Sequence, residues 1–144
     1  MKADKTTYDL IRSPLIEGEK LKAYKCTAGK WTIGAGLCFY PDGKAVKQGD
    51  IITQKQSEQM FYARSVEFTR DVNNCLKREL TQSQWNVLFS IAWNYGTGWF
   101  SEKRLIVAQF NKNPNDFIEI KRILMLMDNK NRRMNEYKYL KRKL

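Results

Sequence analysis

The chain of 144 residues is long enough to bury one sizeable core, and 42% hydrophobic residues is an ordinary share for a folded protein. This composition excludes a mainly disordered chain, and no apolar run approaches the roughly 20 residues that a membrane-spanning helix needs. Lys and Arg outnumber Asp and Glu by 26 to 15, so the formal net charge of +11 attracts polyanions without identifying which one.

Cysteine and histidine usage narrows the possible chemistry. Cys26, Cys38 and Cys75 are widely spaced and odd in number, and the sequence contains no histidine. This pattern argues against a disulfide framework and against the common zinc spacings, so we expect a reducing compartment, no metal and no cofactor. Without histidine, acid and base catalysis near neutral pH must come from carboxylates, a perturbed thiol, tyrosine or lysine.

The first predicted element is a short helix over Tyr8–Leu21, whose apolar residues recur at helical spacing. Pro14 is expected near its first turn or at a kink, and Gly18 near its end. Glu17 is then placed in the last turn of this helix.

The next segment, Tyr24–Ile52, is rich in glycine and turn signals and is predicted to form a small, strand-bearing lobe. Trp31–Ile33 favour a strand, and the neighbouring glycines suit a tight hairpin. Turns are predicted at Pro41–Gly43 and at Gly49–Asp50. The stretch Glu17–Gly36 therefore places an acid, a thiol, a hydroxyl and four glycines at the wall of a cleft.

Two capping boxes predict where the central helices begin. Thr53, with a glutamine three residues later, opens a helix through about Cys75 that is long enough to connect two lobes. Thr81, with a glutamine at the same spacing, opens the strongly apolar helix Gln82–Tyr95, which we expect in the core.

Shorter helices are predicted at Leu105–Phe110 and at Phe117–Met127, separated by a turn around Pro114. A basic tail, Asn129–Leu144, follows them. The sequence shows neither an internal repeat nor a low-complexity linker, so residues 1–144 are predicted to form one mostly helical domain.

Four blocks in chain order carry a resemblance to a known family. Within Glu17–Gly36, a Glu-Gly pair leads to Ala-Tyr and then to Thr-Ile-Gly-x-Gly, which resembles the active-site signature of phage-type lysozymes, glycoside hydrolase family 24. Segments similar to the family's link into the connecting helix, its central core helix and its C-terminal arginine motif follow at 47–53, 80–100 and 131–136. The resemblance spans about residues 10 to 140.

The resemblance implies an α+β, mostly helical, lysozyme-like fold with two lobes in one domain. A small β-hairpin lobe is expected at about residues 18–55, with the remainder forming a larger helical lobe and a long helix joining the two. It also implies a muramidase that hydrolyses the β-1,4 bond between N-acetylmuramic acid and N-acetylglucosamine in bacterial peptidoglycan. Such an endolysin, expected without signal peptide or transmembrane segment, waits in the host cytoplasm until membrane permeabilisation releases it to the periplasm or wall.

The resemblance also implies roles for particular residues. The family generally uses Glu, Asp and Thr; by position, Glu17 is the acid and Thr32 the hydroxyl, whereas Cys26 occupies the position that usually holds Asp. A second departure is Leu37, where the family usually has His. The expected substrate-binding residues are Trp93, Asn94, Leu37 and Cys38, and the expected supporting residues are Arg132 and Tyr24.

Cys26 leaves the mechanism open. Glycoside hydrolysis normally uses two carboxyl groups, and a thiolate can replace one of them as a base or as a nucleophile. Lys25 and Lys30 are expected to favour the thiolate. Cys26 could instead help Thr32 to position water, or be an inert small residue.

Other interpretations stay open as well. Glu19 is a rival to Glu17 as the acid, although its position two residues away favours a solvated role. Trp93 suits a core position as well as the cleft wall. The chain could also be a catalytically inactive lysozyme-fold protein that binds peptidoglycan, or regulates another protein, without cutting the wall.

The positive charge allows further partners. Electrostatic contact with anionic envelope polymers or a membrane surface is expected, and the tail Tyr137–Leu144 could lie on anionic lipid, although a solvated helix end is the simpler interpretation. A specific nucleic acid is not expected, because nothing resembling a recognition helix or a base-stacking platform accompanies the basic residues. Nothing in the sequence requires more than a monomer.

Overall fold

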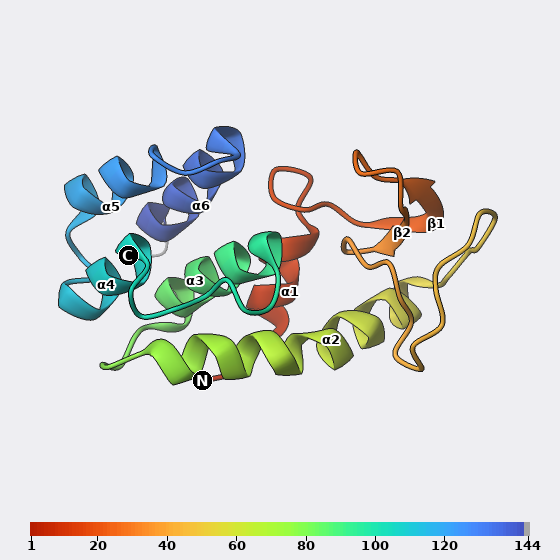
Figure 1. Ribbon diagram of the computed structural model, residues 1–144, viewed down its shortest axis with the longest axis horizontal. Coiled ribbons are helices and arrows are strands. Elements are labelled where there is room, and N and C mark those ends of the chain that lie inside the picture. The colour runs from red at the N-terminus through yellow and green to blue at the C-terminus, as the bar shows by residue number, and fades with distance from the viewer. Residues whose placement is uncertain (143–144) are drawn as a thin grey trace.

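The computed structural model describes residues 1–142 and contains, within that range, six helices and one antiparallel pair of strands. In chain order the elements are α1 (Lys5–Arg12), β1 (Lys20–Lys25), β2 (Trp31–Gly34), α2 (Gln54–Cys75), α3 (Gln82–Tyr95), α4 (Leu105–Lys112), α5 (Phe117–Leu124) and α6 (Lys130–Arg142). Figure 1 shows the hairpin at one end, α3–α6 gathered at the other, and α2 running along both. The predicted α+β, mostly helical, two-lobed fold is confirmed.

Helix α1 is shorter than the sequence predicted, because it ends at Arg12 instead of Leu21. Pro14 is the physical reason, since a proline disfavours the helical conformation at the preceding residue, and Ser13 accordingly has an extended ψ of 135°. Leu21 belongs to β1. Glu17 therefore lies in the turn that follows the helix and not in its last turn.

The two strands form the predicted hairpin, with Tyr24 of β1 opposite Thr32 of β2. The turn between them is tight, because the Cys26 N–H donates to the Lys30 carbonyl at 2.9 Å. After β2 the chain folds back, and Leu37 pairs with the strand it has just left. The hairpin and this return segment place several predicted site residues side by side.

The rest of the small lobe is loop, and its predicted turns are confirmed. The Gly43 N–H donates to the Tyr40 carbonyl at 2.9 Å, and the Asp50 N–H donates to the Lys47 carbonyl at 3.2 Å. These turns return the chain to the start of α2 (Figure 1).

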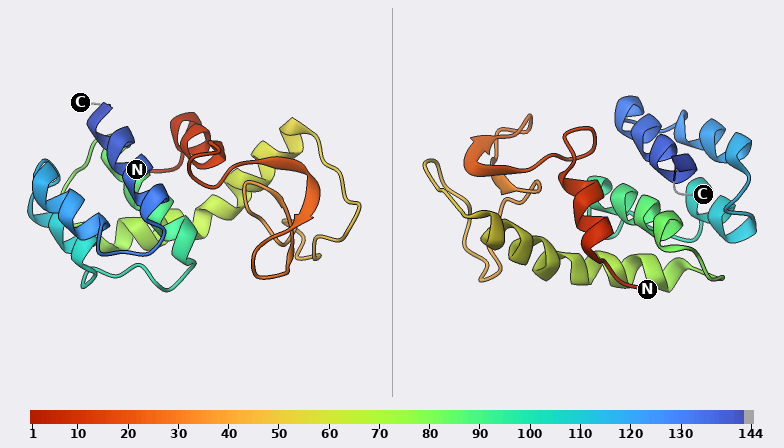
Figure 2. Two further views of the ribbon diagram at one scale, coloured as in Figure 1. Left: turned by 90° about the horizontal axis from the view of Figure 1, so that it is seen from above. Right: turned by 180° about the vertical axis from the view of Figure 1, so that it is seen from behind.

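The central helices begin where the capping boxes predicted. Thr53 and Gln56 form the box at the start of α2, and Thr81 and Gln84 form the box at the start of α3. Helix α2 has 22 residues and reaches from the hairpin lobe to the helical lobe, whereas α3 is surrounded by other helices (Figure 2).

An aromatic cluster fixes α2 against α3. The ring centroids of Phe61 and Phe89 are 5.9 Å apart, and those of Phe89 and Trp93 are 5.6 Å apart. All three side chains are buried, so their apolar area is removed from water, which stabilises this contact. Helices α2 and α3 are thus joined through the core.

The last helices depart slightly from their predicted bounds. Helix α4 continues past Phe110 to Lys112, and α5 ends at Leu124 before the predicted Met127. A tighter turn replaces the missing part of α5, with the Met127 N–H donating to the Leu124 carbonyl at 3.1 Å. Asn129 then has a φ of 57°, a left-handed conformation at the entry to α6.

The basic tail is helical through Arg142, whereas Lys143 and Leu144 lie outside the described residues. Within residues 1–142, the helices are too short or too polar to cross a membrane.

Candidate active site

Glu17 and Arg132 form an ion pair between the loop after α1 and the first turns of α6. Arg132 Nη1 lies 2.5 Å from Glu17 Oε2, and the side chains are 7% and 26% exposed, respectively. The second terminal nitrogen of Arg132 donates to the Ser90 carbonyl in α3 at 2.9 Å. Because the guanidinium is held at two points, it fixes the direction of a carboxylate that remains accessible from solvent.

Gly36, at the end of the family-like signature, packs against this carboxylate. A Cβ atom at Gly36 would lie 2.8 Å from both Cγ and Cδ of Glu17. The Gly36 φ of +86° is also in the region that favours glycine. A glycine is therefore required here both by the backbone and by the position of Glu17.

Tyr24, Cys26, Thr32 and Cys38 lie together on the hairpin and its return segment. The Thr32 hydroxyl donates to the Lys30 carbonyl at 3.0 Å and lies 3.7 Å from Cys38 Sγ. Burial raises the pKa of Tyr24, and so do the negative charges of Glu17, Cys26 and Cys38. The predicted acid and the predicted thiol therefore both lie within electrostatic reach of this tyrosine.

The Cys26 thiol is half-exposed in the hairpin turn and has a lowered pKa. The Lys30 backbone is the largest cause and the Thr32 hydroxyl the next, because hydrogen bonds to a thiolate favour the ionised form. Hydrogen bonds, and not the expected charges of Lys25 and Lys30, thus lower the pKa of Cys26. The Lys25 ammonium lies over the Trp31 ring instead. A lowered pKa increases the fraction of thiolate, which is the form that acts as base or nucleophile.

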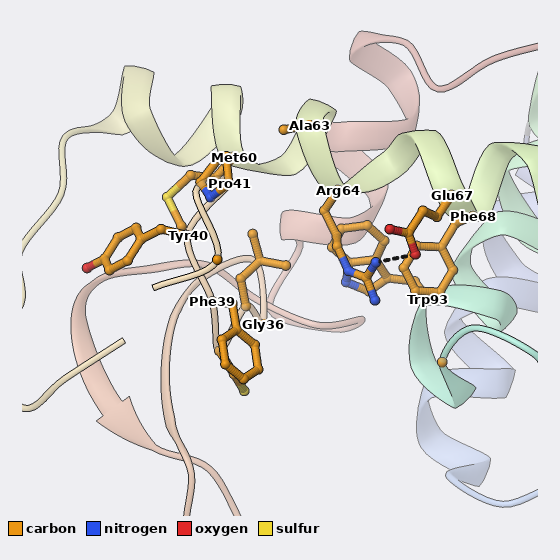
Figure 3. Close-up of a pocket in the computed structure, with 14 residues that line it drawn as sticks. Gly36, Phe39, Tyr40, Pro41, Met60, Ala63, Arg64, Glu67, Phe68 and Trp93 are labelled. Atoms are coloured by element: carbon orange, nitrogen blue, oxygen red, sulfur yellow. Dashed lines mark hydrogen bonds and ion pairs between the residues drawn. The ribbon is translucent and has the colours of Figure 1, made fainter. Parts of the chain in front are cut away.

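A cavity of about 500 Å³ lies between the two lobes. Phe39 and Tyr40 from the small lobe line one side, and Arg64 and Glu67 of α2 line the other together with Trp93 of α3 (Figure 3). Arg64 Nη1 lies 2.8 Å from Glu67 Oε2. The lining of this cavity is thus partly aromatic and includes the Arg64–Glu67 ion pair.

A second cavity, of about 520 Å³, has a polar lining that includes Glu17, Arg132, Asn94 and Asn129. Gly36 lines the first cavity and touches Glu17, which lines the second, so the two cavities adjoin at this carboxylate. A chain-like ligand lying across both would pass over Glu17.

The expected substrate-binding residues occupy different environments. Trp93 is 8% exposed and its Nε1–H donates to the Ala35 carbonyl at 3.1 Å, so it is a core residue that also lines the first cavity. Asn94 Oδ1 accepts hydrogen bonds from Asn129 at 3.1 Å and from Arg133 at 2.9 Å. Leu37 lines the first cavity, although the residue is largely buried.

Glu19 does not have the solvated role that its sequence position favoured. Its side chain is 7% exposed, and Arg12 Nη2 lies 2.8 Å from its carboxylate. Tyr8 and Ser57 donate hydrogen bonds to Glu19 Oε2, and Gln54 donates to Oε1. The prediction was wrong because two of these partners, Gln54 and Ser57, come from α2, which is distant in sequence, and Glu19 is therefore a structural group.

Sequence reasoning missed several residues that shape the site. It did not assign Gly36, Arg64, Asn129, Arg133 or Glu136 to it. Glu136 and Arg133 belong to the arginine motif that was recognised, so the motif was a usable signal for them. Gly36 ends the recognised signature and so had a local signal too, whereas Arg64 and Asn129 had none. Among residues 1–142, no group of three or more His, Cys, Asp or Glu is arranged to hold a metal ion.

A carboxylate between a hairpin lobe and a helical lobe, held by an arginine of the last helix, defines a protein of the lysozyme-like class. The sequence matches the family model described as phage lysozyme over residues 15–136. The chain belongs to the phage lysozyme family.

Its relatives are consistent with this assignment. The chain is 36% identical over 97 residues to an endolysin of Acyrthosiphon pisum secondary endosymbiont phage 1, a match covering 67% of this chain and 63% of that protein. It is 38% identical over 108 residues to an endolysin of Bacillus phage PZA, covering 74% of this chain and 40% of that protein. The matched region thus spans less than two thirds of either relative.

The fold is shared with a solved structure. The endolysin from Escherichia coli O157:H7 phage FAHEc1 superposes with a TM-score of 0.85 at 27% sequence identity. The match covers 100% of this chain and 96% of that chain. The fold is therefore shared over nearly all of that chain.

Proposed function

We propose that this chain is a peptidoglycan hydrolase, a muramidase that cleaves the β-1,4 bond between N-acetylmuramic acid and N-acetylglucosamine. The observation that carries the proposal is the Glu17 carboxylate, fixed by Arg132 at 2.5 Å where two cavities adjoin. Membership of the phage lysozyme family supports the same reaction.

In the proposed reaction Glu17 is the general acid, and its proton passes to the leaving glycosidic oxygen as the C1–O bond breaks. Cys26 and Thr32 act at C1. In one route the Cys26 thiolate attacks C1 and forms a thioglycosyl bond, which water then displaces after giving its proton to Glu17. In the other route the thiolate accepts a proton from water, held by Thr32, as that water attacks C1.

Further residues are proposed to bind the sugar chain. The edge of Trp93 at the first cavity offers an aromatic surface, and the Asn94 amide at the second can bond an N-acetyl group. Leu37 and Cys38 line the first cavity beside them. Tyr24 lies within electrostatic reach of Glu17 and Cys26 and is proposed to support the site.

The test is mass analysis of the fragments released from purified peptidoglycan. The wild type is expected to release muropeptides with muramic-acid reducing ends, and Glu17→Gln and Cys26→Ser are expected to lower this release by about 100-fold or more. The matched controls are Glu79→Gln, an exposed acid between α2 and α3, and Cys75→Ser at the end of α2. Both controls should retain the wild-type rate.

The outcomes separate the possible functions. If Glu17→Gln is inactive while Cys26→Ser is fully active, the thiol has no chemical role and Thr32 alone guides the water. If the wild type sediments with the wall but releases no fragments, the chain is a lysozyme-fold binding or regulatory protein, and the proposed hydrolysis is wrong.

We also propose the biological setting of an endolysin. The protein waits as a monomer in the host cytoplasm and reaches the periplasm or wall when the membrane is permeabilised. The basic face of α6 then contacts anionic envelope polymers or a membrane surface. Replacing Lys138, Lys141 and Arg142 by glutamine should lower activity on intact envelopes but not on purified peptidoglycan; equal losses on both substrates would contradict envelope contact.

A further inference from the structure

A group of buried charges lies next to Glu17, and Glu136 is its acidic member, to which the proposed chemistry assigns no role. Arg132, Arg133 and Glu136 are all on α6, with side chains 7%, 0% and 0% exposed. Burying a charge is costly unless an opposite charge or hydrogen bonds compensate it. The burial of three charged side chains beside the proposed active site therefore requires an explanation.

The contacts of Glu136 connect both arginines. Its Oε1 lies 2.6 Å from Arg133 Nε, and its Oε2 lies 3.6 Å from Arg132 Nε. The Ser90 hydroxyl of α3 donates to Oε2 at 2.5 Å. The three guanidinium nitrogens of Arg132 consequently face three different groups. Nε faces Glu136, Nη2 donates to the Ser90 carbonyl and Nη1 donates to Glu17.

Glu136 lowers the net positive charge of this buried group. With Glu17 and Glu136 ionised, two carboxylates neutralise the permanently charged Arg132 and Arg133. When Glu17 holds a proton, as a general acid must, the group has one net positive charge. Without Glu136 that charge would be two, and the buried arginines would strongly favour the ionised form of Glu17.

Other ionisable groups surround this group of charges. Tyr95 of α3 lies under the Arg133 guanidinium, whose Cζ is 5.4 Å from the Tyr95 ring centroid, and Tyr24 of β1 lies within electrostatic reach of Glu17. Lys130 lines the same polar cavity as Glu17. Burial raises the pKa of Glu136, while the Arg133 and Arg132 charges and the Ser90 hydroxyl oppose that rise. Because two guanidinium groups lie within 3.6 Å of Glu136, they favour its ionised carboxylate form.

We propose that Glu136 is a positioning residue that acts through Arg132. It balances the charge of the buried arginines, so that Arg132 can orient Glu17 without preventing Glu17 from taking up a proton. The catalytic consequence rests on the proposed muramidase function, whereas the coupling between Glu136 and Glu17 can be measured without any turnover.

The experiment follows the protonation of Glu17 by NMR of carboxyl-¹³C-labelled glutamate, with the Glu17 signal assigned by its loss in Glu17→Gln. In Glu136→Gln the pH of half-protonation of Glu17 should fall by about one unit. The alkaline limb of the kcat–pH profile should move in the same direction, with KM within about twofold of the wild type.

Two further variants separate charge balance from packing. Arg133→Gln removes the opposite charge and should raise the pH of half-protonation of Glu17, which keeps the test available if Glu136→Gln does not fold. The double variant Arg133→Gln/Glu136→Gln restores the charge count and should return it to the wild-type value. The surface control Glu119→Gln, whose partner is the exposed Arg122, should change neither readout.

The results that overturn the proposal are distinct from those that overturn the function. Unchanged protonation of Glu17 in folded Glu136→Gln or Arg133→Gln contradicts the coupling, and so does a double variant that stays shifted. A wild type that releases no muropeptides contradicts the muramidase function, while the NMR titration still decides whether Glu136 acts on Glu17.

Discussion

Glu17 and Gly36 are in contact, and the carboxylate of the first occupies the space where a side chain on the second would begin. A Cβ atom at Gly36 would lie 2.8 Å from Cγ and Cδ of Glu17 and nearer still to Oε1. The contact joins the proposed acid to the loop that follows β2. Any residue larger than glycine must therefore move either the loop or the carboxylate.

Gly36→Ala should consequently lower the proposed muramidase activity. We expect kcat for peptidoglycan cleavage to fall by about 100-fold, because a displacement of about 1 Å at a catalytic group has an effect of that size. The free energy of unfolding should fall by about 1 kcal/mol or more, since alanine is strained at a φ of +86°. Muropeptide release and urea unfolding measure the two effects.

Gly49→Ala is the matched control. Gly49 has a φ of +87°, yet nothing lies within 4 Å of the position of its Cβ. This variant should lose a similar amount of stability and keep its kcat. Equal losses of activity in both variants would mean that backbone strain, and not the contact with Glu17, is responsible.

Trp93→Phe tests how the cleft loop is held against the helical lobe. The variant keeps an aromatic ring beside Phe89 but removes the Nε1–H that donates to the buried Ala35 carbonyl at 3.1 Å. An unsatisfied buried carbonyl costs about 1–3 kcal/mol, so the free energy of unfolding should fall by that amount. Chemical denaturation measures the loss.

The comparison for this variant is Trp99→Phe. Trp99 stacks on Tyr95 with ring centroids 4.3 Å apart, a contact that phenylalanine can largely preserve. The loss should therefore be below about 1 kcal/mol. If the two variants lose equal stability, ring size explains the effect of Trp93→Phe and the hydrogen bond does not.

The sequence predicted those elements whose signals are local. The capping boxes at Thr53 and Thr81 require only four consecutive residues, and both helices begin where they were expected. The end of α1 was misplaced because apolar spacing continues beyond Pro14, whereas the conformational restriction on Ser13 decided the outcome. Local sterics thus prevailed over periodicity.

The site depended on contacts that no local pattern shows. Glu17 and Arg132 are 115 residues apart, and family resemblance, not spacing, suggested their association. Glu19 was expected in solvent because its partners Tyr8 and Ser57 come from separate elements. The proposed catalytic roles of the site residues remain predictions that the variants above test.

Glu19 gives a prediction for acid stability. Burial alone would raise its pKa, but hydrogen bonds from Tyr8, Ser57 and Gln54, together with the Arg12 charge, lower it below the ordinary value. Because the folded state prefers ionised Glu19, the stabilisation is fully present above the unfolded pKa of about 4.3. It is lost as the pH falls through the lowered pKa of the folded state.

Glu19→Gln should therefore lower the free energy of unfolding by about 2 kcal/mol near neutral pH, because it weakens several hydrogen bonds to a charged group. The difference from the wild type should shrink below about pH 4, where the wild-type carboxylate takes up its proton. Urea unfolding across this pH range measures it, with exposed Glu79→Gln as the control. A difference that stays constant with pH would contradict the ionic contribution.

Cys26 and Cys75 should differ in the pH dependence of their alkylation. The Lys30 backbone and the Thr32 hydroxyl lower the pKa of Cys26, whereas burial raises the pKa of Cys75. Because the thiolate is the reactive form, the rate for Cys26 should reach half its maximum at a lower pH than that of an ordinary thiol, and the rate for Cys75 at a higher pH. Brief treatment with iodoacetamide, followed by mass spectrometry of the two peptides, measures both rates.

Thr32→Val sharpens this test because it removes one of the two main causes of the lowered pKa. The pH of half-maximal alkylation at Cys26 should rise, but only in part, since the Lys30 backbone remains the larger cause. Alkylation of Cys26 should also abolish muropeptide release in proportion to the fraction modified, while Cys75→Ser changes neither. Equal pH profiles at the two thiols would contradict the hydrogen-bonded thiolate and, with it, the proposed part of Cys26 in the reaction.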